Sequence, residues 1–360
     1  MYIQTPVDYS FVAIGDIHLG WKLYNMPELQ EDSRVLLERA VEFAISKKVT
    51  FFIVAGDMYD TQTPSEELVK FVTGLVVRLR AHKIIPIAIS GDHDKRPGVD
   101  TTWVNDVNGF DTSLGPIHGV NYKNFLNVPG ALATVQHPED VHWIVLHGQE
   151  ETLFPYIDEK KRLSLKHVDY SRFPNLIGIL LGDIHSPIEG QIEIPELKRQ
   201  IPVFYTGSLN VVRSNEIGDQ KGVLYWDGQN LTRKHLEPTR TYAKFEFPQD
   251  EHMLPKFLED IKDEKEKPLM VVVHQDDLTN EQKDSLKAFD GKVLLKCAKV
   301  RKGKVEEVVN IRSELRTDNK IEGVAGLLIE DESLRQLFVN LIQASDFKSL
   351  LDKYKEDILK

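Results

Sequence analysis

The sequence has almost no cysteine and no long apolar run. Its single cysteine, Cys297, excludes a framework of intramolecular disulfides and is typical of a protein in a reducing compartment. No apolar run approaches the roughly 18–20 residues that a membrane-spanning helix needs. The first residues also lack the charged lead, apolar core and cleavage site of a secretory signal. We therefore expect a soluble protein of the cytoplasm.

Positive charge is also scarce. The chain has 45 Lys and Arg against 56 Asp and Glu, which gives a net charge of −11. Such a balance argues against a protein that coats nucleic acid through a basic surface, because that affinity comes from neutralising phosphates. It does not exclude a nuclease, since bound metal ions can supply positive charge locally and a partner subunit can carry the affinity for DNA.

The sequence does contain five short apolar runs that each end at a polar tip. Continuous apolar runs of this length are typical of strands buried on both faces. Helical patterns with a period near 3.6 separate the first three runs, around residues 35–43 and 68–79. This order indicates an α/β domain, in which sites form past the carboxyl ends of the strands. The runs cover residues 11–14, 51–55, 84–89, 143–146 and 176–181.

The tips carry carboxylates and imidazoles and no thiolate. Such donors suit Mn, Fe, Zn or Mg, and the absence of thiolates argues against a structural zinc site. Two ions about 3.5–4 Å apart can clamp a phosphate and activate a water for in-line attack. We therefore expect one shared binuclear centre; the alternative is that each residue is an ordinary turn or core residue. The side chains are Asp16, His18, Asp57, Asp92, His93, His147, Asp183 and His185.

Two further regions follow. Strand-like runs at 242–247, 269–274 and 292–300 alternate with helical patterns at 253–261 and 281–289, which predicts a small α/β module. Amphipathic patterns at 334–342 and 347–358 predict a helical hairpin whose apolar stripes need a partner, unless they pack on their own domain or on another copy of the chain. We expect domains at 1–238, 239–308 and 309–360.

The tips together resemble the ordered motifs of the calcineurin-like metallophosphoesterases. Within them the sequence is most similar to the SbcD and meiotic-recombination-eleven group of DNA double-strand-break nucleases. Residues 16–20, "DIHLG", have that group's form of the first motif, and residues 204–227 resemble its closing segment. The resemblance implies a four-layer α/β/β/α sandwich with a small α/β capping domain that contacts DNA.

The resemblance also implies partners and an activity. The C-terminal hairpin would bind a coiled-coil, SbcC-like ATPase, and the chain would form a homodimer. The activity would be exonuclease or endonuclease cleavage at double-stranded or single-stranded DNA ends, in recombination, repair or replication. The cofactors would be two divalent ions, Mn²⁺ first and Mg²⁺ second. A phage-encoded chain would act in the host cytoplasm.

A further implication of the resemblance is the ligand set, in which the two ions share the carboxylate of Asp57. His93 would stabilise or protonate the leaving oxygen. Asp94 would orient His93 or the adjoining loop, unless its role, like that of Asp60, is structural only. The remaining ligands would be Asp16, His18 and His185 for the first ion, and Asp92, His147 and Asp183 for the second.

Several residues beside the tips are candidates for substrate contacts. Lys95, Arg96 and Arg213 could bind DNA phosphates, although ordinary exposed bases would look the same. Trp21 and Trp103 could stack on a base, although packing within the protein is the favoured interpretation.

Two residues depart from the family's pattern. The family usually has Asn in the third motif and His in the last, where this chain has Asp92 and Asp183. Both replacements add negative charge at the second ion, so we expect Mn²⁺ or Mg²⁺ to be preferred over Zn²⁺. The opposite interpretation is a catalytically weakened scaffold subunit. A nucleotide or small-molecule phosphodiesterase is the other alternative.

Overall fold

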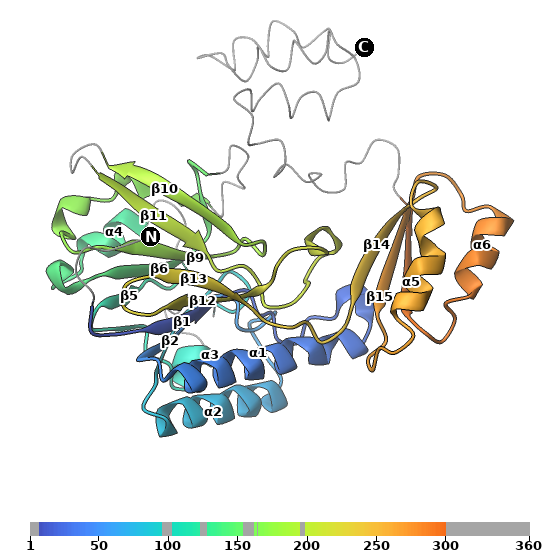
Figure 1. Cartoon of the computed structure of the whole chain (residues 1–360). Coiled ribbons are helices and arrows are strands. Elements are labelled where there is room, and N and C mark those ends of the chain that lie inside the picture. The colour runs from blue at the N-terminus through green and yellow to red at the C-terminus, as the bar shows by residue number, and fades with distance from the viewer. Residues whose placement is uncertain are drawn as a thin grey trace, which may run out of the picture. The chain divides into compact units, whose positions relative to one another are not determined.

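The computed structural model describes residues 7–95, 103–122, 128–153, 162–163, 165–194 and 199–299. The chain divides into two compact units, Met1–Lys299 and Val300–Lys360, and all the described residues belong to the first (Figure 1). The predicted hairpin in 309–360 and the end of the predicted capping domain therefore lie outside the described residues. The expected boundaries at 238 and 308 stay predictions.

The first sheet carries three of the predicted tips. Its strand order is β13-β12-β1-β2-β3, in which β1, β2 and β3 are parallel and β12 and β13 are antiparallel. Every residue of β1 and β2 is buried, as expected for strands covered on both faces. The strands are β1 (Phe11–Ile14), β2 (Phe51–Ala55), β3 (Ile85–Ile89), β12 (Gly222–Trp226) and β13 (Leu231–His235).

Two helices cover one face of this sheet, side by side (Figure 1). Helix α1 (Glu28–Lys47) ends at Lys48, which adopts a left-handed φ of 52°. Helix α2 (Glu66–Ala81) begins at Ser65, whose side chain accepts a hydrogen bond from the Leu68 amide. Both helices present an apolar stripe to the sheet, as their 3.6-residue period predicts.

The second sheet carries the other two tips. Its order is β10-β11-β9-β6-β5-β4, with β5, β6, β9 and β11 parallel. The strands are β4 (Ser113–Leu114), β5 (Ile117–Gly119), β6 (Trp143–His147), β9 (Gly178–Gly182), β10 (Ile188–Ile194) and β11 (Arg199–Tyr205). Shorter elements around it are α4 (Val128–Ala133), η2 (Pro138–Asp140), β7 (Gln149–Glu150), β8 (Arg162–Leu163), η3 (Leu165–His167) and η4 (Tyr170–Arg172). Helix α3 (Trp103–Asp106) lies instead beside β3 of the first sheet.

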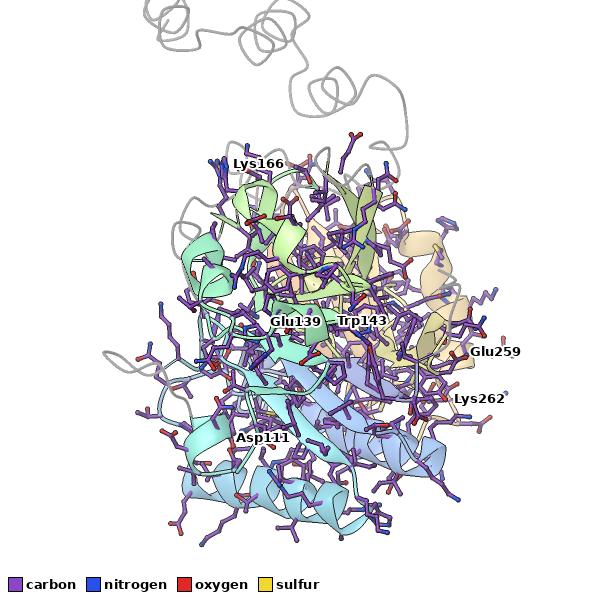
Figure 2. The ribbon with its side chains drawn as sticks, turned by 90° about the vertical axis from the view of Figure 1, so that its left-hand side faces the viewer. Asp111, Glu139, Trp143, Lys166, Glu259 and Lys262 are labelled. Carbon is purple, nitrogen blue, oxygen red and sulfur yellow. The ribbon has the colours of Figure 1, made fainter. Side chains whose placement is uncertain are left out.

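The two sheets share one core. In β1, Phe11 and Ala13 point toward the second sheet and pack with Trp143, whereas Val12 and Ile14 pack toward α1 and α2. This alternation follows from the two-residue period of a strand. Trp143 is fully buried, while Lys166, Glu259 and Lys262 are exposed (Figure 2).

A third, parallel sheet has the order β14-β15-β16 and matches the predicted second module. One face packs against two helices, and the other contacts Leu23, Leu29 and Val211 through Leu269 and Val271. The elements are β14 (Tyr242–Phe247), η7 (Glu251–Met253), α5 (Leu254–Asp260), β15 (Leu269–His274), α6 (Asn280–Lys287) and β16 (Leu294–Lys299).

The predicted α/β class is confirmed, since the described residues form several sheets with helices packed against them. Within those residues, we find no helix with both the length and the apolar character to span a membrane.

Candidate metal centre

The polar tips of both sheets meet at the carboxyl ends of β1, β2, β3, β6 and β9. The first two tips are joined by their backbones, because the amides of Ile17 and His18 donate to the Asp57 carbonyl at 2.9 and 3.0 Å. The Asp183 amide donates to Asp16 Oδ1 at 2.9 Å, which ties the two sheets together. The repeated Gly-Asp-x-His tips, far apart in the sequence, are therefore neighbours in the fold.

The backbone of the tips is strained. Asp16, His18, Asp57 and Asp183 have φ values of 51°, 49°, 50° and 85°, which place them in the left-handed region. Non-glycine residues rarely adopt this region, and those that do concentrate at functional sites. The strained backbone turns these side chains inward at the sheet edge.

The tips also come unusually close to one another at Gly91. A Cβ at this position would lie 1.9 Å from Asp57 Oδ1 and 2.6 Å from the Asp57 amide nitrogen. Only glycine therefore lets the third tip approach the second. The Asp57 Oδ1 atom accepts a hydrogen bond from the His93 amide at 3.0 Å, which fixes the direction of the carboxylate.

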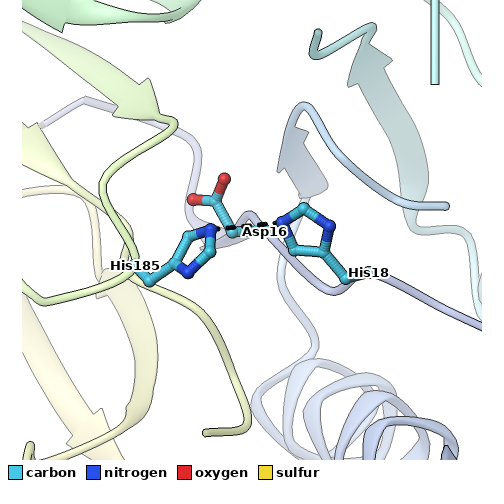
Figure 3. A group of neighbouring side chains, drawn as sticks. All are labelled: Asp16, His18 and His185. Atoms are coloured by element: carbon cyan, nitrogen blue, oxygen red, sulfur yellow. Dashed lines mark hydrogen bonds between the residues drawn. The ribbon is translucent and has the colours of Figure 1, made fainter. Parts of the chain in front are cut away.

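One group of possible ligands consists of Asp16, His18 and His185. One ligand atom from each lies within 4.8 Å of the others. The Nε2 atoms of His18 and His185 are 3.2 Å apart, and Figure 3 shows the two rings facing each other beside the Asp16 carboxylate. Two imidazole nitrogens this close, with a carboxylate beside them, form an arrangement suited to a shared cation.

A second group surrounds His147. Its Nε2 atom lies 3.3 Å from Asp92 Oδ1, 3.4 Å from Asp57 Oδ2 and 4.0 Å from Asp183 Oδ1. Asp57 Oδ2 also lies 3.6 Å from His18 Nε2. This oxygen is thus next to one histidine of each group, where a carboxylate shared by two ions would stand. All seven predicted ligands are brought together.

Residues 9–187 match the family model described as calcineurin-like phosphoesterase. The match spans all five tips. The chain contains a calcineurin-like metallophosphoesterase domain. It is a metal-dependent hydrolase, as the sequence predicts. A dimetal phosphatase from Danio rerio aligns at 13% identity over 57% of this chain and 88% of its own, with a TM-score of 0.34.

The donors of the metallophosphoesterase domain fit divalent ions. Asp16 is fully buried, and its Oδ2 atom has no hydrogen-bond partner among the described residues. A buried carboxylate oxygen without a partner is costly, and a coordinated cation would remove that cost. The set combines oxygen and imidazole nitrogen, which suits Mn, Fe or Zn.

Each candidate histidine ligand has an acceptor at its other ring nitrogen. His18 Nδ1 lies 3.1 Å from Asp60 Oδ1, and His147 Nδ1 lies 2.9 Å from the Ala55 carbonyl. His185 Nδ1 lies 2.8 Å from Glu216 Oε1. Acceptors at Nδ1 favour the tautomer that leaves the Nε2 lone pair free to bind a metal.

Glu216 is the functional candidate that sequence reasoning missed. It belongs to η6 (Ser214–Glu216), is 2% exposed, and lies in the acidic loop before Lys221. Burial raises its pKa, but the His185 hydrogen bond and the Lys221 ammonium outweigh burial and bring the pKa to about 2. The sequence shows the acid but not which histidine it meets.

Electrostatics favour a cation at the centre. Burial raises the pKa of Asp16. Burial also opposes a proton on His147, yet the carboxylates of Asp57, Asp92 and Asp16 outweigh it and hold its pKa well above the usual range. Burial likewise acts to raise the pKa of Asp57, but His147 and His18 lower it overall. The carboxylates thus create a field that stabilises positive charge.

His93 lies at the rim of this site. Its side chain is 40% exposed, its ring lies edge-on to the His18 ring at 4.7 Å, and its Nδ1 atom is 3.5 Å from Asp60 Oδ1. The hydrogen bond to Asp60 is the main reason that its pKa is raised to about 9, against a smaller opposing effect of burial. His93 can therefore hold a proton near neutral pH.

Asp94 has a different environment. It is buried and accepts hydrogen bonds from the amides of Gly91 at 2.7 Å and Met58 at 2.8 Å. Burial, and then the charge of Asp57, raises its pKa to about 7. These contacts join the second and third tips, so Asp94 orients the loop that carries the third tip. The carboxylate that contacts His93 is instead Asp60.

The candidate substrate contacts are only partly described. Lys95 is exposed and lies over the Tyr122 ring at 4.5 Å, and Arg213 is exposed next to η6. Trp21 is 40% exposed, with its indole nitrogen donating to the Val212 carbonyl at 3.0 Å. Arg96 and the side chain of Trp103 lie outside the described residues.

Proposed function

We propose that this chain is a two-metal nuclease that hydrolyses phosphodiester bonds at DNA ends. The observation that carries the proposal is that Asp57 Oδ2 lies beside Nε2 of both His18 and His147, while His185 Nε2 lies beside His18 Nε2. The "DIHLG" form of the first motif and the closing segment at 204–227 support a DNA substrate, because they resemble the SbcD and meiotic-recombination-eleven nucleases.

The side chains would hold two ions, with Asp57 available to both. When bound, such ions hold phosphate oxygens and activate a water for in-line attack. In this proposal the first ion takes Asp16, His18, Asp57 and His185, and the second takes Asp57, Asp92, His147 and Asp183.

His93 would give its proton to the leaving oxygen. Its exposed ring and its pKa of about 9 support this role, since the imidazole is protonated at neutral pH and reaches solvent. Asp60 would hold the ring through Nδ1 and leave Nε2 to face the substrate.

The cofactor we propose is Mn²⁺, with Mg²⁺ as the second choice. Asp92 and Asp183 are charged oxygen donors, where the family usually has neutral ones, and they lie 3.3 and 4.0 Å from His147 Nε2. Oxygen donors favour these harder ions over Zn²⁺.

The finer architecture and the partners are part of the same proposal. We assign the four-layer sandwich to residues 1–238, a DNA-contacting cap to 239–308 and a hairpin that binds an SbcC-like ATPase to 309–360. Lys95, Arg96 and Arg213 would contact phosphates, and the nuclease would act as a homodimer in recombination, repair or replication. The three parallel strands after residue 241 support the cap.

The test is cleavage of an end-labelled linear duplex with Mn²⁺, Mg²⁺ or EDTA. The wild-type chain should shorten the duplex only with metal, and His93→Ala should lower the rate by about 10²–10⁴-fold, the usual contribution of a general acid. His82→Ala, an exposed histidine on another surface, is the matched control and should cleave normally.

Other outcomes separate the alternatives. Hydrolysis of bis(p-nitrophenyl) phosphate without any cleavage of DNA would replace the nuclease by a small-molecule phosphodiesterase. Metal binding without hydrolysis of either substrate would favour a scaffold subunit, an alternative that the two added carboxylates and the net charge of −11 support.

A further inference from the structure

The loop after β11 holds a buried carboxylate directly behind His185. Glu216 Oε1 lies 2.8 Å from His185 Nδ1, and Glu216 is 2% exposed. On the opposite side of the ring, His185 Nε2 lies 3.2 Å from His18 Nε2, beside Asp16 (Figure 3). The imidazole therefore stands between a buried acid and the centre of the proposed metal site.

The other oxygen of Glu216 is surrounded by hydrogen-bond donors. Its Oε2 atom accepts from Lys221 Nζ at 2.8 Å and from the Val212 amide at 3.0 Å. Lys221 is 7% exposed and also donates to the His185 carbonyl at 3.0 Å. These contacts fix the carboxylate, so it cannot turn away from the ring without breaking the buried ion pair with Lys221.

The arrangement determines which ring nitrogen carries the proton. A carboxylate only accepts hydrogen bonds, so Nδ1 of His185 must donate to Glu216. In the neutral ring Nε2 then keeps its lone pair, which is the form that binds a metal.

We propose that Glu216 is a positioning residue of the metal centre, which sets the tautomer and the ring direction of His185. The inference rests on the proposed function, because it takes His185 as a metal ligand. Lys221 and the Val212 amide hold Glu216 in place and so act on the metal site through it.

Glu216→Gln is the most informative change because it preserves the shape of the side chain. The donors at Lys221 and Val212 would keep the glutamine oxygen on their side, which turns the NH₂ group toward His185 Nδ1. Two donors cannot share a hydrogen bond, so the ring would carry its proton on Nε2 and lose its metal-binding lone pair. Glu216→Ala imposes no tautomer, so it should impair metal binding less.

The experiment compares Mn²⁺ titrations by calorimetry for the wild-type full chain, Glu216→Gln and Glu216→Ala. We expect Mn²⁺ affinity at one of two sites to fall about 10–100-fold in Glu216→Gln, and less in Glu216→Ala. Glu193→Gln is the matched control and should bind normally, because it makes the same substitution at an exposed position of β10. Thermal unfolding of each metal-free variant separates loss of the site from loss of the fold.

Nitrogen NMR of the metal-free chain gives a second readout, with the His185 signals assigned by their absence in His185→Gln. The protonated nitrogen should be Nδ1 in the wild type and Nε2 in Glu216→Gln. An unchanged tautomer with wild-type Mn²⁺ affinity would overturn the inference alone, as would a larger loss in Glu216→Ala than in Glu216→Gln. A wild-type chain that binds no Mn²⁺ would instead overturn the proposed metal centre.

Discussion

Asp57 is the residue on which both halves of the site depend. Its Oδ1 atom is fixed by the His93 amide, and its Oδ2 atom lies 3.6 Å from His18 Nε2 and 3.4 Å from His147 Nε2. Asp57→Asn should therefore weaken the binding of both ions and lower hydrolysis by on the order of 100-fold or more. Metal content and turnover, measured on the same sample of Asp57→Asn, test this prediction. If that variant still bound two ions with normal affinity, Asp57 would not be a shared ligand. Asp140→Asn, an exposed acid in η2, is the control.

His93 and Asp60 give a prediction about pH. Because a carboxylate partner favours the charged imidazole, the Asp60 hydrogen bond is the main cause of the His93 pKa of about 9. In the metal-free protein, Asp60→Asn should lower the midpoint of His93 titration toward the ordinary histidine value of about 6.5. Proton NMR across pH 5–10 measures it. An unmoved midpoint would mean that the other acids alone raise the pKa.

Replacing either of two glycines by alanine should change the stability of the fold, but in opposite directions. Gly91→Ala places a methyl group against Asp57 Oδ1 and the Asp57 backbone, so it should destabilise the fold by about 1–3 kcal/mol. Gly74 lies in α2, and outside the adjoining backbone of that helix a Cβ there would meet no atom of the described residues within 4 Å. Gly74→Ala should therefore stabilise by about 0.5–1 kcal/mol. Urea unfolding compares them, and equal effects would show that Gly91 is not confined by the tips.

At the scale of elements, strands buried on both faces were predictable, whereas the edge strands β10 and β13 were not. The runs at β1, β2, β6 and β9 are apolar throughout, so composition alone indicates them. Strand β10 (Ile188–Ile194) alternates exposed residues with partly or fully buried ones, and no residue of β13 is fully buried. Both strands lie at the rim of their sheets, and neither is among the predicted strands. Their signal is weak because only one face is buried.

The site likewise has residues that the sequence indicates and contacts that it does not. The tip residues follow recognisable strands, so the sequence could name them. The pairing of Glu216 with His185 joins residues from different loops, and no spacing rule reaches across them. Such contacts appear only when the loops are placed by the fold.

Helix α1 and the segment just before β14 are joined by a buried ion pair. Arg240 donates to Asp32 through Nε at 2.6 Å and Nη2 at 2.8 Å, and both residues are 5% exposed or less. Arg240→Ala leaves the Asp32 charge buried and unpaired, so it should destabilise by about 3–5 kcal/mol. Adding Asp32→Asn in the same chain should recover part of that loss. Denaturant unfolding of the two single variants and the double variant measures how strongly Arg240 and Asp32 stabilise each other. A loss in the double variant equal to the sum of the two single losses would contradict the ion pair.

At the scale of the whole molecule, the centre joins two sheets at the ends of five strands. Buried carboxylates from both sheets face one another there, so a bound cation would stabilise the folded chain and not the unfolded one. Free Mn²⁺ at about 100 times its dissociation constant should raise the free energy of unfolding by about 2.7 kcal/mol per site. Thermal unfolding with Mn²⁺ and with EDTA measures the shift. Asp57→Asn should remove most of it, and an equal shift in that variant would place the stabilising ion elsewhere in the chain.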